Sequence, residues 1–208
     1  MTAEAYVASL FDLTGHVGII TGASRGIGAG IAEVLSSAGA SVYNFSRTGP
    51  DAPFQGTQGS VTFVPCDVRD AAGFQNALAR IAGSCGHLDF LINNAGVMDD
   101  MSPIGDFTNA KLEQVFAINV YGPMYAMRKA VEIFKAQGGG NIINVVSEGA
   151  FHSCAGAVYC ASKAALTSLT KNTAFMYMPD HIRCNAIAPG GIATEIANSM
   201  GMPNMAGY

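Results

Sequence analysis

Short apolar runs of strand length alternate with longer stretches of helical spacing along most of the chain. The short runs are rich in β-branched and aromatic residues and end at Gly, Asn or Ser, a pattern typical of buried parallel strands. The predicted strands are His16–Ile20, Ser41–Phe45, Val61–Val64, Asp89–Asn93, Asn141–Val146 and Ile182–Ile187.

Between these runs, apolar residues recur three and four positions apart, as at Ile27, Ile31 and Val34, which indicates amphipathic helices. Strands separated by helices predict an α/β fold: a doubly wound, Rossmann-like parallel sheet in three α/β/α layers, forming a single domain over residues 1–208. The connection from Thr48 to Gly59 is rich in turn residues and predicts a loop. The predicted helices are Ile27–Ser37, Ala71–Ala82, Asn109–Val120, Tyr121–Ala136 and Ala157–Met176.

Composition narrows the class of protein. Half of the 208 residues are hydrophobic and 12% are charged, which suits one sizeable core. A net charge of −4 without Lys/Arg clusters argues against nucleic-acid binding, and no apolar run is long enough for a membrane span. With no signal-peptide pattern, we expect a cytoplasmic protein. Five scattered cysteines lack metal-ligand spacing and predict reduced thiols and no metal site: Cys66, Cys85, Cys154, Cys160 and Cys184.

A glycine-rich loop follows the first predicted strand and precedes the first helix. Its sequence, from Thr21 to Gly28, is Thr-Gly-Ala-Ser-Arg-Gly-Ile-Gly. Glycines allow a tight turn and close backbone approach, and the helix N-terminus offers free N–H groups, so the segment predicts an anion site. An ordinary tight turn is the alternative, and the spacing departs from the usual Gly-x-Gly-x-x-Gly fingerprint.

Tyr159 and Lys163 stand four residues apart and therefore share one face of the last long helix. An unperturbed tyrosine has a pKa of about 10, and a nearby lysine charge favours the phenolate and brings the pKa toward neutrality. Alone, the pair is weak evidence of catalysis because both residue types are common.

Several short motifs accompany this pair along the chain. They are Thr21-Gly22-x-x-x-Gly26-x-Gly28, Asp67, Asn93-Asn94-Ala95-Gly96, Asn119, Ser147, Tyr159-x-x-x-Lys163 and Pro189-Gly190. In these motifs and in their order, over nearly its whole length, the chain resembles the short-chain dehydrogenase/reductase family. The resemblance implies hydride transfer between a nicotinamide cofactor and a carbonyl or secondary alcohol.

The resemblance also implies four catalytic residues. Tyr159 would be the general acid in reduction and the base in oxidation, and Lys163 would lower its pKa and bind the nicotinamide ribose. Ser147 would bind the substrate oxygen, although a turn cap is its plainer interpretation. Asn119 would hold a water of a proton relay, although a helix kink without such a role is the alternative.

Nicotinamide binding is expected at the carboxyl ends of the strands. Asp67 and Val68 match the family's adenine-contacting pair, and residues 189–194 match its nicotinamide-contacting segment. The full expected set is Gly22, Ser24, Arg25, Gly26, Ile27, Gly28, Ser46, Arg47, Thr48, Asp67, Val68, Asn94, Ala95, Gly96, Tyr159, Lys163, Pro189, Gly190, Ile192 and Thr194.

The end of the second strand bears on the choice of cofactor. It reads Ser46-Arg47-Thr48, without the carboxylate that binds a ribose 2′-hydroxyl in NAD-preferring relatives. Arg47 can pair with a 2′-phosphate, and Arg25 adds charge, so we expect NADP(H) rather than NAD(H). A solvated loop arginine is the alternative for Arg47.

Substrate and assembly are harder to predict. Pocket walls are expected from Met98–Met101 and Glu148–Cys154; Phe151 and His152 could face the ligand, although a surface-loop histidine is the plainer interpretation. The resemblance implies a homodimer or homotetramer built on the long helices. A non-catalytic NAD(P)-binding scaffold or sensor is the alternative function.

The C-terminal segment departs from the family pattern. Family members usually continue through a substrate-covering segment, another helix and a seventh strand, which Asn198–Tyr208 does not supply. We therefore expect a shortened form of a longer enzyme rather than a naturally complete one, with the strand Ile182–Ile187 as an exposed edge unless a partner or a missing segment covers it.

Overall fold

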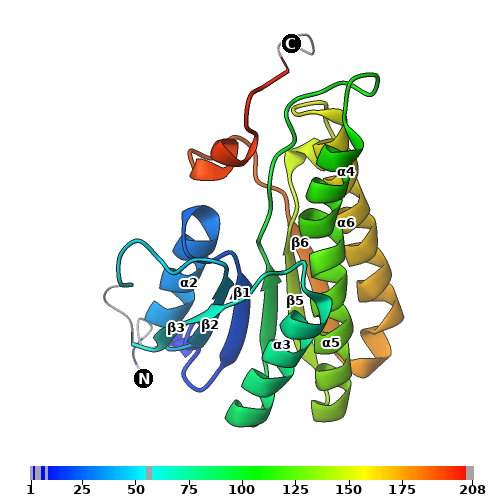
Figure 1. Cartoon of the computed structure of the whole chain (residues 1–208). Coiled ribbons are helices and arrows are strands. Elements are labelled where there is room, and N and C mark those ends of the chain that lie inside the picture. Colours follow the sequence, from blue (N-terminus) through cyan, green and yellow to red (C-terminus); the bar gives the residue numbers. More distant parts are fainter. Residues whose placement is uncertain (1, 3–5, 8, 55–57, 205–208) are drawn as a thin grey trace.

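Six parallel strands form one sheet in the order β3-β2-β1-β4-β5-β6 (Figure 1). The structure is a computed structural model that describes residues 2, 6–7, 9–54 and 58–204. The order reverses between β1 and β4, so the loops that follow these strands diverge and leave a crevice for a ligand. The strands are β1 Val17–Thr21, β2 Ser41–Ser46, β3 Ser60–Pro65, β4 Phe90–Asn93, β5 Gly140–Val145 and β6 Ile182–Ile187.

Helices cover both faces, as the three-layer prediction requires (Figure 1). Helix α2 packs on one face, where it buries Ala32 against Ile20 and Val42. The other helices bury Phe74, Phe134 and Leu166 against the opposite face. The α-helices are α2 Gly26–Ser37, α3 Ala71–Cys85, α4 Asn109–Phe116, α5 Gly122–Gln137 and α6 Ala157–Met176, and short 3-10 segments are η2 Glu148–Ala150, η3 Met178–Asp180 and η4 Glu195–Ser199.

The helix ends follow from local sequence. Asp70 caps α3 by accepting a hydrogen bond from the N–H of Gly73, and α3 stops where Gly86 adopts a left-handed conformation. Gly138 ends α5 in the same way. Helix α3 ends at Cys85, three residues beyond the predicted Ala82. A larger difference lies at residue 120, where two abutting helices were predicted: α4 instead runs into a π-helical turn, Ala117–Tyr121, that leads directly into α5. This turn, labelled η1, carries Asn119.

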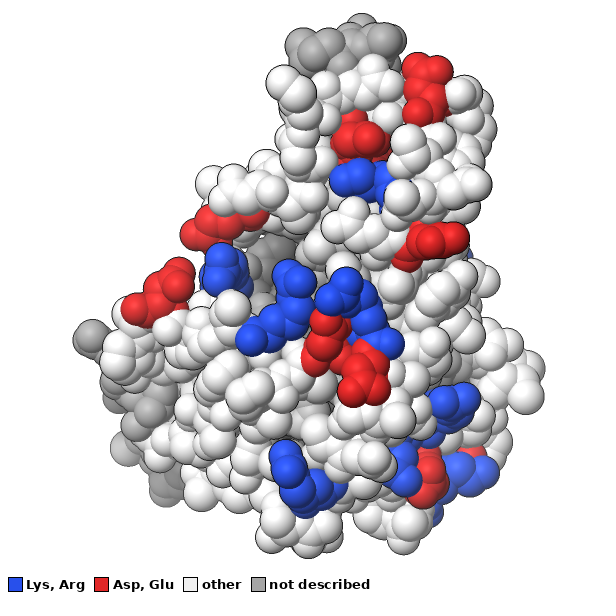
Figure 2. All heavy atoms as spheres, viewed as in Figure 1, with Lys and Arg blue, Asp and Glu red and all other residues white. Residues whose placement is uncertain are grey.

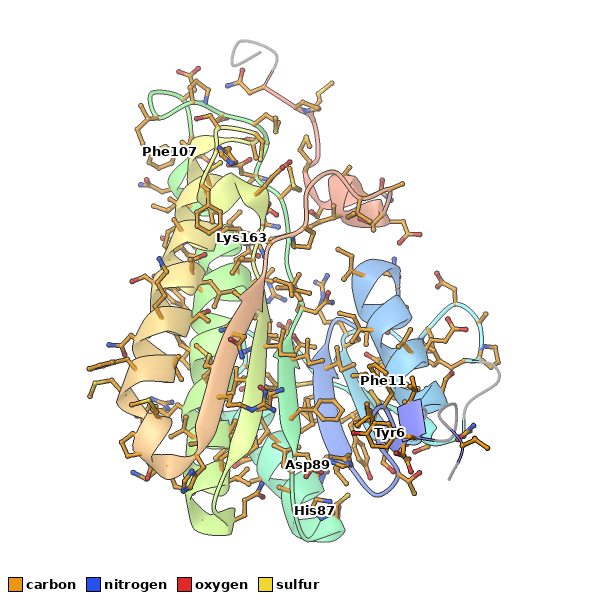
Figure 3. All side chains as sticks on the ribbon, turned by 180° about the vertical axis from the view of Figure 1, so that it is seen from behind. Tyr6, Phe11, His87, Asp89, Phe107 and Lys163 are labelled. Carbon is orange, nitrogen blue, oxygen red and sulfur yellow. The ribbon has the colours of Figure 1, made fainter. Side chains whose placement is uncertain are left out.

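Among the strands of the described residues, β6 pairs only with β5 and forms one edge of the sheet, as expected. Seen from behind, strands β4 to β6 face the viewer without a helix over them (Figure 3). Residues 188–204 hold η4 but no strand. The rest of the predicted C-terminal segment, residues 205–208, lies outside the described residues, as do residues 55–57 of the predicted 48–59 loop.

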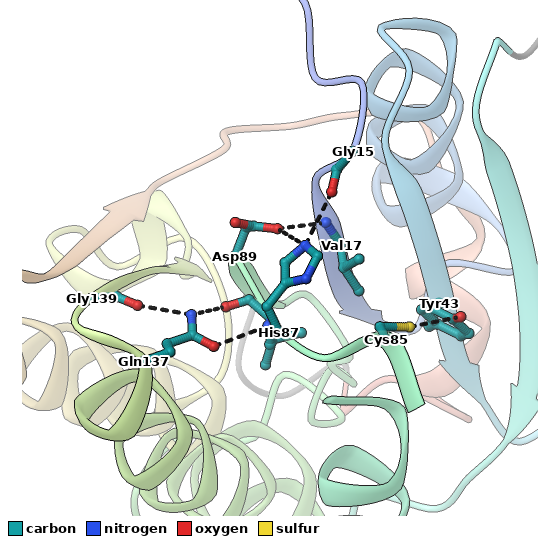
Figure 4. Close-up of polar contacts among 9 residues, drawn as sticks. Gly15, Val17, Tyr43, Cys85, His87, Asp89, Gln137 and Gly139 are labelled. Atoms are coloured by element: carbon teal, nitrogen blue, oxygen red, sulfur yellow. Dashed lines mark hydrogen bonds and ion pairs between the residues drawn. The ribbon is translucent and has the colours of Figure 1, made fainter. Parts of the chain in front are cut away.

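The amino-terminal ends of the central strands are tied by side-chain to backbone contacts (Figure 4). Asp89 accepts a 2.7 Å hydrogen bond from the N–H of Val17, and its carboxylate lies 3.2 Å from the His87 ring. Gln137, at the end of α5, both accepts from the N–H of Leu88 and donates to its carbonyl. These contacts fix β1, β4 and α5 at the end of the sheet away from the crevice.

Acidic and basic side chains are interspersed on the face shown in Figure 2. Within the described residues, no helix is long and apolar enough to cross a membrane. The same residues contain no group of three His, Cys, Asp or Glu side chains placed to hold a metal, and the five cysteines are free thiols.

Candidate active site

A cavity of about 700 Å³ opens at the carboxyl ends of the strands. Figure 3 shows Lys163 at this end of the sheet and His87 and Asp89 at the other. Every residue of the expected catalytic and cofactor-binding sets lines the cavity except Gly28 and Asn119, which lie just behind it. The expected residues on its wall are Gly22, Ser24, Arg25, Gly26, Ile27, Ser46, Arg47, Thr48, Asp67, Val68, Asn94, Ala95, Gly96, Ser147, Tyr159, Lys163, Pro189, Gly190, Ile192 and Thr194.

The glycine-rich loop turns sharply from β1 into α2. Gly22 and Gly26 have positive φ angles of 69° and 56°, which glycine adopts without strain. Gly28 lies inside the first turn of α2, where an added Cβ would stand 2.4 Å from Nδ2 of Asn94 and 2.5 Å from the carbonyl oxygen of Gly22. Glycine at this position lets the loop fold back onto the strand end, so that the start of α2 faces the cavity.

Two polar residues that the sequence analysis did not assign hold this loop in place. Thr21 accepts hydrogen bonds at Oγ1 from the N–H groups of Asn94 and Ala95, which ties the end of β1 to the end of β4. Asn44, completely buried in β2, accepts from the N–H of Ala23 and donates to the hydroxyl of Ser24. A buried amide in a predicted strand is the signal that could have found Asn44, since such groups are hydrogen-bonded.

The end of β2 presents cationic side chains to the cavity. Ser46 donates its hydroxyl proton to Asn44, so this hydroxyl is already committed. The Arg25 guanidinium donates to the hydroxyl of Thr48, and both Arg25 and Arg47 are exposed. Arg47 is also close enough to Asp67 to contribute to the lowering of the Asp67 pKa, although hydrogen bonding from Arg69 is the larger cause.

Asp67 follows β3 and makes a two-point ion pair with Arg69, with the shortest N–O distance at 2.5 Å. The adjacent backbone around Val68 packs against α5, where an added Cβ at Gly122 would stand 3.0 Å from the Val68 side chain. At the rim of the cavity, the Asp67 carboxylate is therefore already paired with Arg69.

The segment that follows β4 supplies a narrow wall. The Asn94 side chain donates to the carbonyl oxygens of Thr21 and Gly22. A Cβ at Gly96 would lie 3.4 Å from Nζ of Lys163 and 3.5 Å from Oδ1 of Asn119. Small residues here bring backbone directly against the catalytic candidates.

Tyr159 lies in the first turn of α6, is 6% exposed, and its phenol is close enough to the hydroxyl of Ser147 for Ser147 to influence the phenol's pKa. Burial raises the pKa of the Tyr159 phenol, and the Ser147 hydroxyl opposes this shift without cancelling it. The expectation that Lys163 brings this pKa below its ordinary value is therefore not met. Ser147 also accepts from the N–H of Gly149, so it caps η2 as well as facing the phenol.

Lys163 lies one turn further along α6, with its side chain turned inward. Its ammonium nitrogen donates a 2.9 Å hydrogen bond to the carbonyl of Val145 and sits 5.7 Å from the centre of the Tyr159 ring. Burial lowers the pKa of Lys163 to about 8. A positive charge at this depth lies beside both the phenol and the cavity.

The Asn119 side chain links the segment that follows β4 to α6 and does not line the cavity. Its side chain accepts from the N–H of Val97, donates to the carbonyl of the same residue, and donates to the hydroxyl of Ser162. It is fully buried within the π-helical turn, so the expected irregularity of the helix is present at this residue.

The substrate end of the cavity is lined by Met98, Glu148 and Cys154, as expected. Phe151 and His152 are exposed and do not line it, so the surface-loop interpretation of His152 fits and a ligand-facing position does not. Residues of η4 add a wall that the sequence analysis left undefined. Thr194 lies over the glycine loop, 3.3 Å from the position of a Cβ at Gly26.

The cavity has the features that a dinucleotide requires. The glycine loop exposes the start of α2, the arginines lie beside the β2 end, and backbone lines the wall near Lys163. Its volume is within the range of small-molecule sites, roughly 300–1,000 Å³. The fold and this site define a dinucleotide-binding α/β protein.

Comparison with known proteins identifies the family. The family model described as short chain dehydrogenase matches residues 16–203. The chain is 36% identical over 202 residues to 3beta-hydroxysteroid dehydrogenase 2 of Eggerthella lenta, covering 94% of this chain and 78% of that protein. The chain therefore belongs to the short-chain dehydrogenase family and is an NAD(P)-dependent oxidoreductase of CH–OH and C=O groups.

Solved structures agree on the fold. NADPH-dependent 3-quinuclidinone reductase from Rhodotorula rubra superposes with a TM-score of 0.83 at 28% identity, covering 90% of this chain and 74% of that one. The 3-ketoacyl-(acyl-carrier-protein) reductase from Brucella melitensis, complexed with NADH, gives 0.82 at 29% identity, covering 91% and 80%. The similar structures thus include both nicotinamide cofactors.

Proposed function

We propose that this protein is an NADP(H)-dependent reductase or dehydrogenase that interconverts a carbonyl and a secondary alcohol, with Tyr159 as the general acid and base. The observation that carries this proposal is the convergence of Tyr159, Ser147 and Lys163 at one end of the cavity. Ser147 is close enough to influence the pKa of the phenol, both residues line the cavity, and the Lys163 ammonium lies 5.7 Å from the Tyr159 ring centre.

In the reducing direction, bound reduced nicotinamide supplies a hydride to the carbonyl carbon. Ser147 donates a hydrogen bond to the carbonyl oxygen, and Tyr159 transfers its phenolic proton to that oxygen as negative charge develops. Burial keeps the pKa of Tyr159 raised, so the phenol stays protonated, which is the form that reduction requires. The buried charge of Lys163 stabilises the phenolate left behind, and Asn119 holds the wall against α6.

The preference for NADP(H) rests on the end of β2. Arg25 and Arg47 are exposed there, and guanidinium groups bind phosphate through paired hydrogen bonds. Asp67, a carboxylate that lines the cavity after β3, is already paired with Arg69. The remaining cofactor contacts are assigned to the glycine loop, to residues 94–96 and to residues 189–194.

The test combines cofactor binding with turnover. NADPH binding is measured by fluorescence for the unchanged protein and for Tyr159→Phe, and turnover is measured on a panel of ketones and sugar alcohols. We expect both proteins to bind NADPH and Tyr159→Phe to lose about a hundredfold or more in turnover. NADPH binding without turnover of any substrate by the unchanged protein would instead favour a non-catalytic scaffold or sensor.

We further propose a cytoplasmic homodimer or homotetramer that uses α5 and α6. Five free thiols suit a reducing compartment. Large apolar side chains are exposed near these helices, among them Met124 at 43% and Phe175 at 74%. Light scattering of the purified protein tests the assembly: a mass above that of one chain supports it, and Phe175→Glu together with Met124→Glu is expected to shift the mass toward the monomer.

A further inference from the structure

The loop after β4 carries a buried carboxylate that the reaction scheme above does not use. Asp99 is 1% exposed. Its Oδ1 accepts hydrogen bonds from the N–H groups of Met101, at 3.1 Å, and Gly156, at 3.2 Å. Its Oδ2 accepts a 2.7 Å hydrogen bond from the N–H of Tyr159. A residue sixty positions earlier in the chain therefore binds the backbone of the catalytic tyrosine.

This carboxylate replaces a missing helix cap. Helix α6 starts after Gly156, which has no side chain to accept from the exposed N–H groups of the first turn. A capping side chain normally accepts from the second or third N–H of the helix, and Tyr159 is the third residue. The same loop also satisfies the first residue, since the N–H of Ala157 donates to the carbonyl of Ser102.

Close packing makes the arrangement specific. A Cβ on Gly156 would stand 2.4 Å from Oδ2 and 2.5 Å from Oδ1 of Asp99. Glycine at the start of α6 therefore leaves the space that the carboxylate fills. A negative charge at this position is also favoured by the positive end of the helix dipole.

The carboxylate acts on the Tyr159 phenol through its charge as well. The groups that influence the pKa of Tyr159 are burial, the Ser147 hydroxyl, the thiols of Cys154 and Cys160, and the charge of Asp99, which raises it. The Lys163 ammonium lies 5.7 Å from the centre of the ring. Among these groups Asp99 is the carboxylate, and its negative charge raises the pKa of the Tyr159 phenol.

We propose that Asp99 is a positioning residue, which holds the first turn of α6 so that Tyr159 meets Ser147 and the substrate oxygen. This inference rests on the proposed role of Tyr159 as acid and base. Because a displaced catalytic group costs about a hundredfold per ångström, a cap at the tyrosine's own backbone N–H is a direct means of controlling rate.

The first test is Asp99→Asn, which keeps the side-chain volume. An amide has one acceptor oxygen and an NH₂ group, so at least one of the three N–H donors loses its acceptor. We expect kcat to fall about tenfold to a hundredfold, KM for the cofactor to stay within about threefold, and the alkaline limb of carbonyl reduction to move to lower pH. Asp100→Asn removes the neighbouring carboxylate, whose pKa is influenced by Ser102 and Lys111 and by no residue of α6, and is expected to keep both kcat and the pH profile.

A second variant separates the cap from general stability. In Asp99→Ala combined with Gly156→Ser, the new hydroxyl occupies the space vacated by the carboxylate. The backbone of residue 156, with φ −68° and ψ 165°, already suits a serine cap. We expect the double variant to recover most of the kcat lost in Asp99→Ala while keeping the pH profile at its lower position, because the cap returns and the charge does not.

A third readout does not depend on turnover. The Tyr159 phenol is titrated by NMR in protein carrying ¹³C-labelled tyrosine, with Tyr159→Phe assigning the signal. We expect the titration to move to lower pH in Asp99→Asn, even if no substrate is turned over and the proposed function fails. A folded Asp99→Asn with unchanged kcat and unchanged Tyr159 titration overturns the inference. So does a double variant that regains neither fold nor activity, because Asp99 would then support the fold as a whole.

Discussion

The ammonium nitrogen of Lys163 lies 5.7 Å from the centre of the Tyr159 ring, while its hydrogen bond goes to the carbonyl of Val145. The lysine thus acts on the phenol through its charge and proximity rather than through a direct bond. Within the described part of the chain, no carboxylate lies within ion-pair distance of this ammonium. The buried ammonium therefore has a carbonyl oxygen as its hydrogen-bond acceptor and no ion-pair partner among the described residues. Burial of this charge lowers the free energy of unfolding by a measurable amount.

That cost predicts a pH-dependent stability. Burial lowers the pKa of Lys163 from 10.5 to about 8, so the folded state loses its proton before the unfolded state does. Between these values the unfolded state binds more protons, and stability rises with pH. We expect Lys163→Met to remove this rise, so that the free energy of unfolding of the unchanged protein gains about 2 kcal/mol relative to the variant between about pH 8 and pH 10.

The measurement is urea unfolding of both proteins across that range. Above about pH 10 the raised pKa of Tyr159 acts in the opposite direction, so the comparison ends there. Lys171→Met, on the exposed side of the same helix, is the matched control. Parallel pH curves for Lys163→Met and the unchanged protein would contradict the prediction.

Arg47→Asp tests the choice of cofactor. Loss of a charged hydrogen bond costs about 1.5–3 kcal/mol, so we expect the Kd for NADPH to rise about tenfold to a hundredfold. The Kd for NADH, which lacks the 2′-phosphate, should change by less than about threefold. Arg80→Asp makes the same change of charge on the exposed side of α3 and should affect neither. Equal weakening of both cofactors by Arg47→Asp would rule out a phosphate contact.

Gly28→Ala and Gly30→Ala form a matched pair in the first turns of α2. At Gly28 a methyl group would overlap Nδ2 of Asn94 at 2.4 Å, whereas at Gly30 it meets nothing within 4 Å. We expect Gly28→Ala to weaken NADPH binding by about tenfold or more and to lower the melting temperature, because the loop must shift. Gly30→Ala should bind normally and gain about 0.5–1 kcal/mol of stability from its higher helix propensity. Equal NADPH affinity of the two variants would argue against a tight loop.

The sheet interior offers another test. Asn144 in β5 is fully buried; it accepts from the side chain of Asn93 and donates to Thr170. Asn144→Ala leaves both partners without this bond and is expected to cost about 2–4 kcal/mol in urea unfolding. Asn141→Ala, on the same strand, removes an amide whose oxygen has no hydrogen-bond partner and should cost less than about 1 kcal/mol. A similar cost for both would mean that strand packing outweighs the hydrogen bonds.

The sequence predicts the regular elements well because they depend on local pattern. Strands β2 and β6 and helix α6 begin and end within a residue of the predicted positions. The π-helical turn at residues 117–121 was missed because an extra residue in a helical turn leaves the apolar spacing almost unchanged. Asn119 left a helix kink open as an alternative, but nothing in the sequence indicated a π-helical turn.

In the candidate site, too, some residues could be predicted from local sequence and others could not. Motif residues such as Tyr159 and Lys163 could be assigned because their spacing and neighbours carry the signal. Asp99 could not, because it acts on a segment that the sheet topology brings to it from far along the chain, and Asn44 offered only the signal of an amide within a predicted strand. The pKa of Tyr159 was also beyond prediction, since burial outweighs the influences that the sequence suggested.

The link between Thr21 and Asn94 also makes the glycine loop depend on a distant part of the chain. The glycine loop is complete in sequence by residue 28, yet the side chain of Asn94 must donate to the carbonyls of Thr21 and Gly22 before the loop has its support. We expect the loop to gain this support only when β4, some seventy residues later in the chain, pairs with β1. In a folding experiment, we expect cofactor affinity to appear at the stage at which β4 pairs with β1.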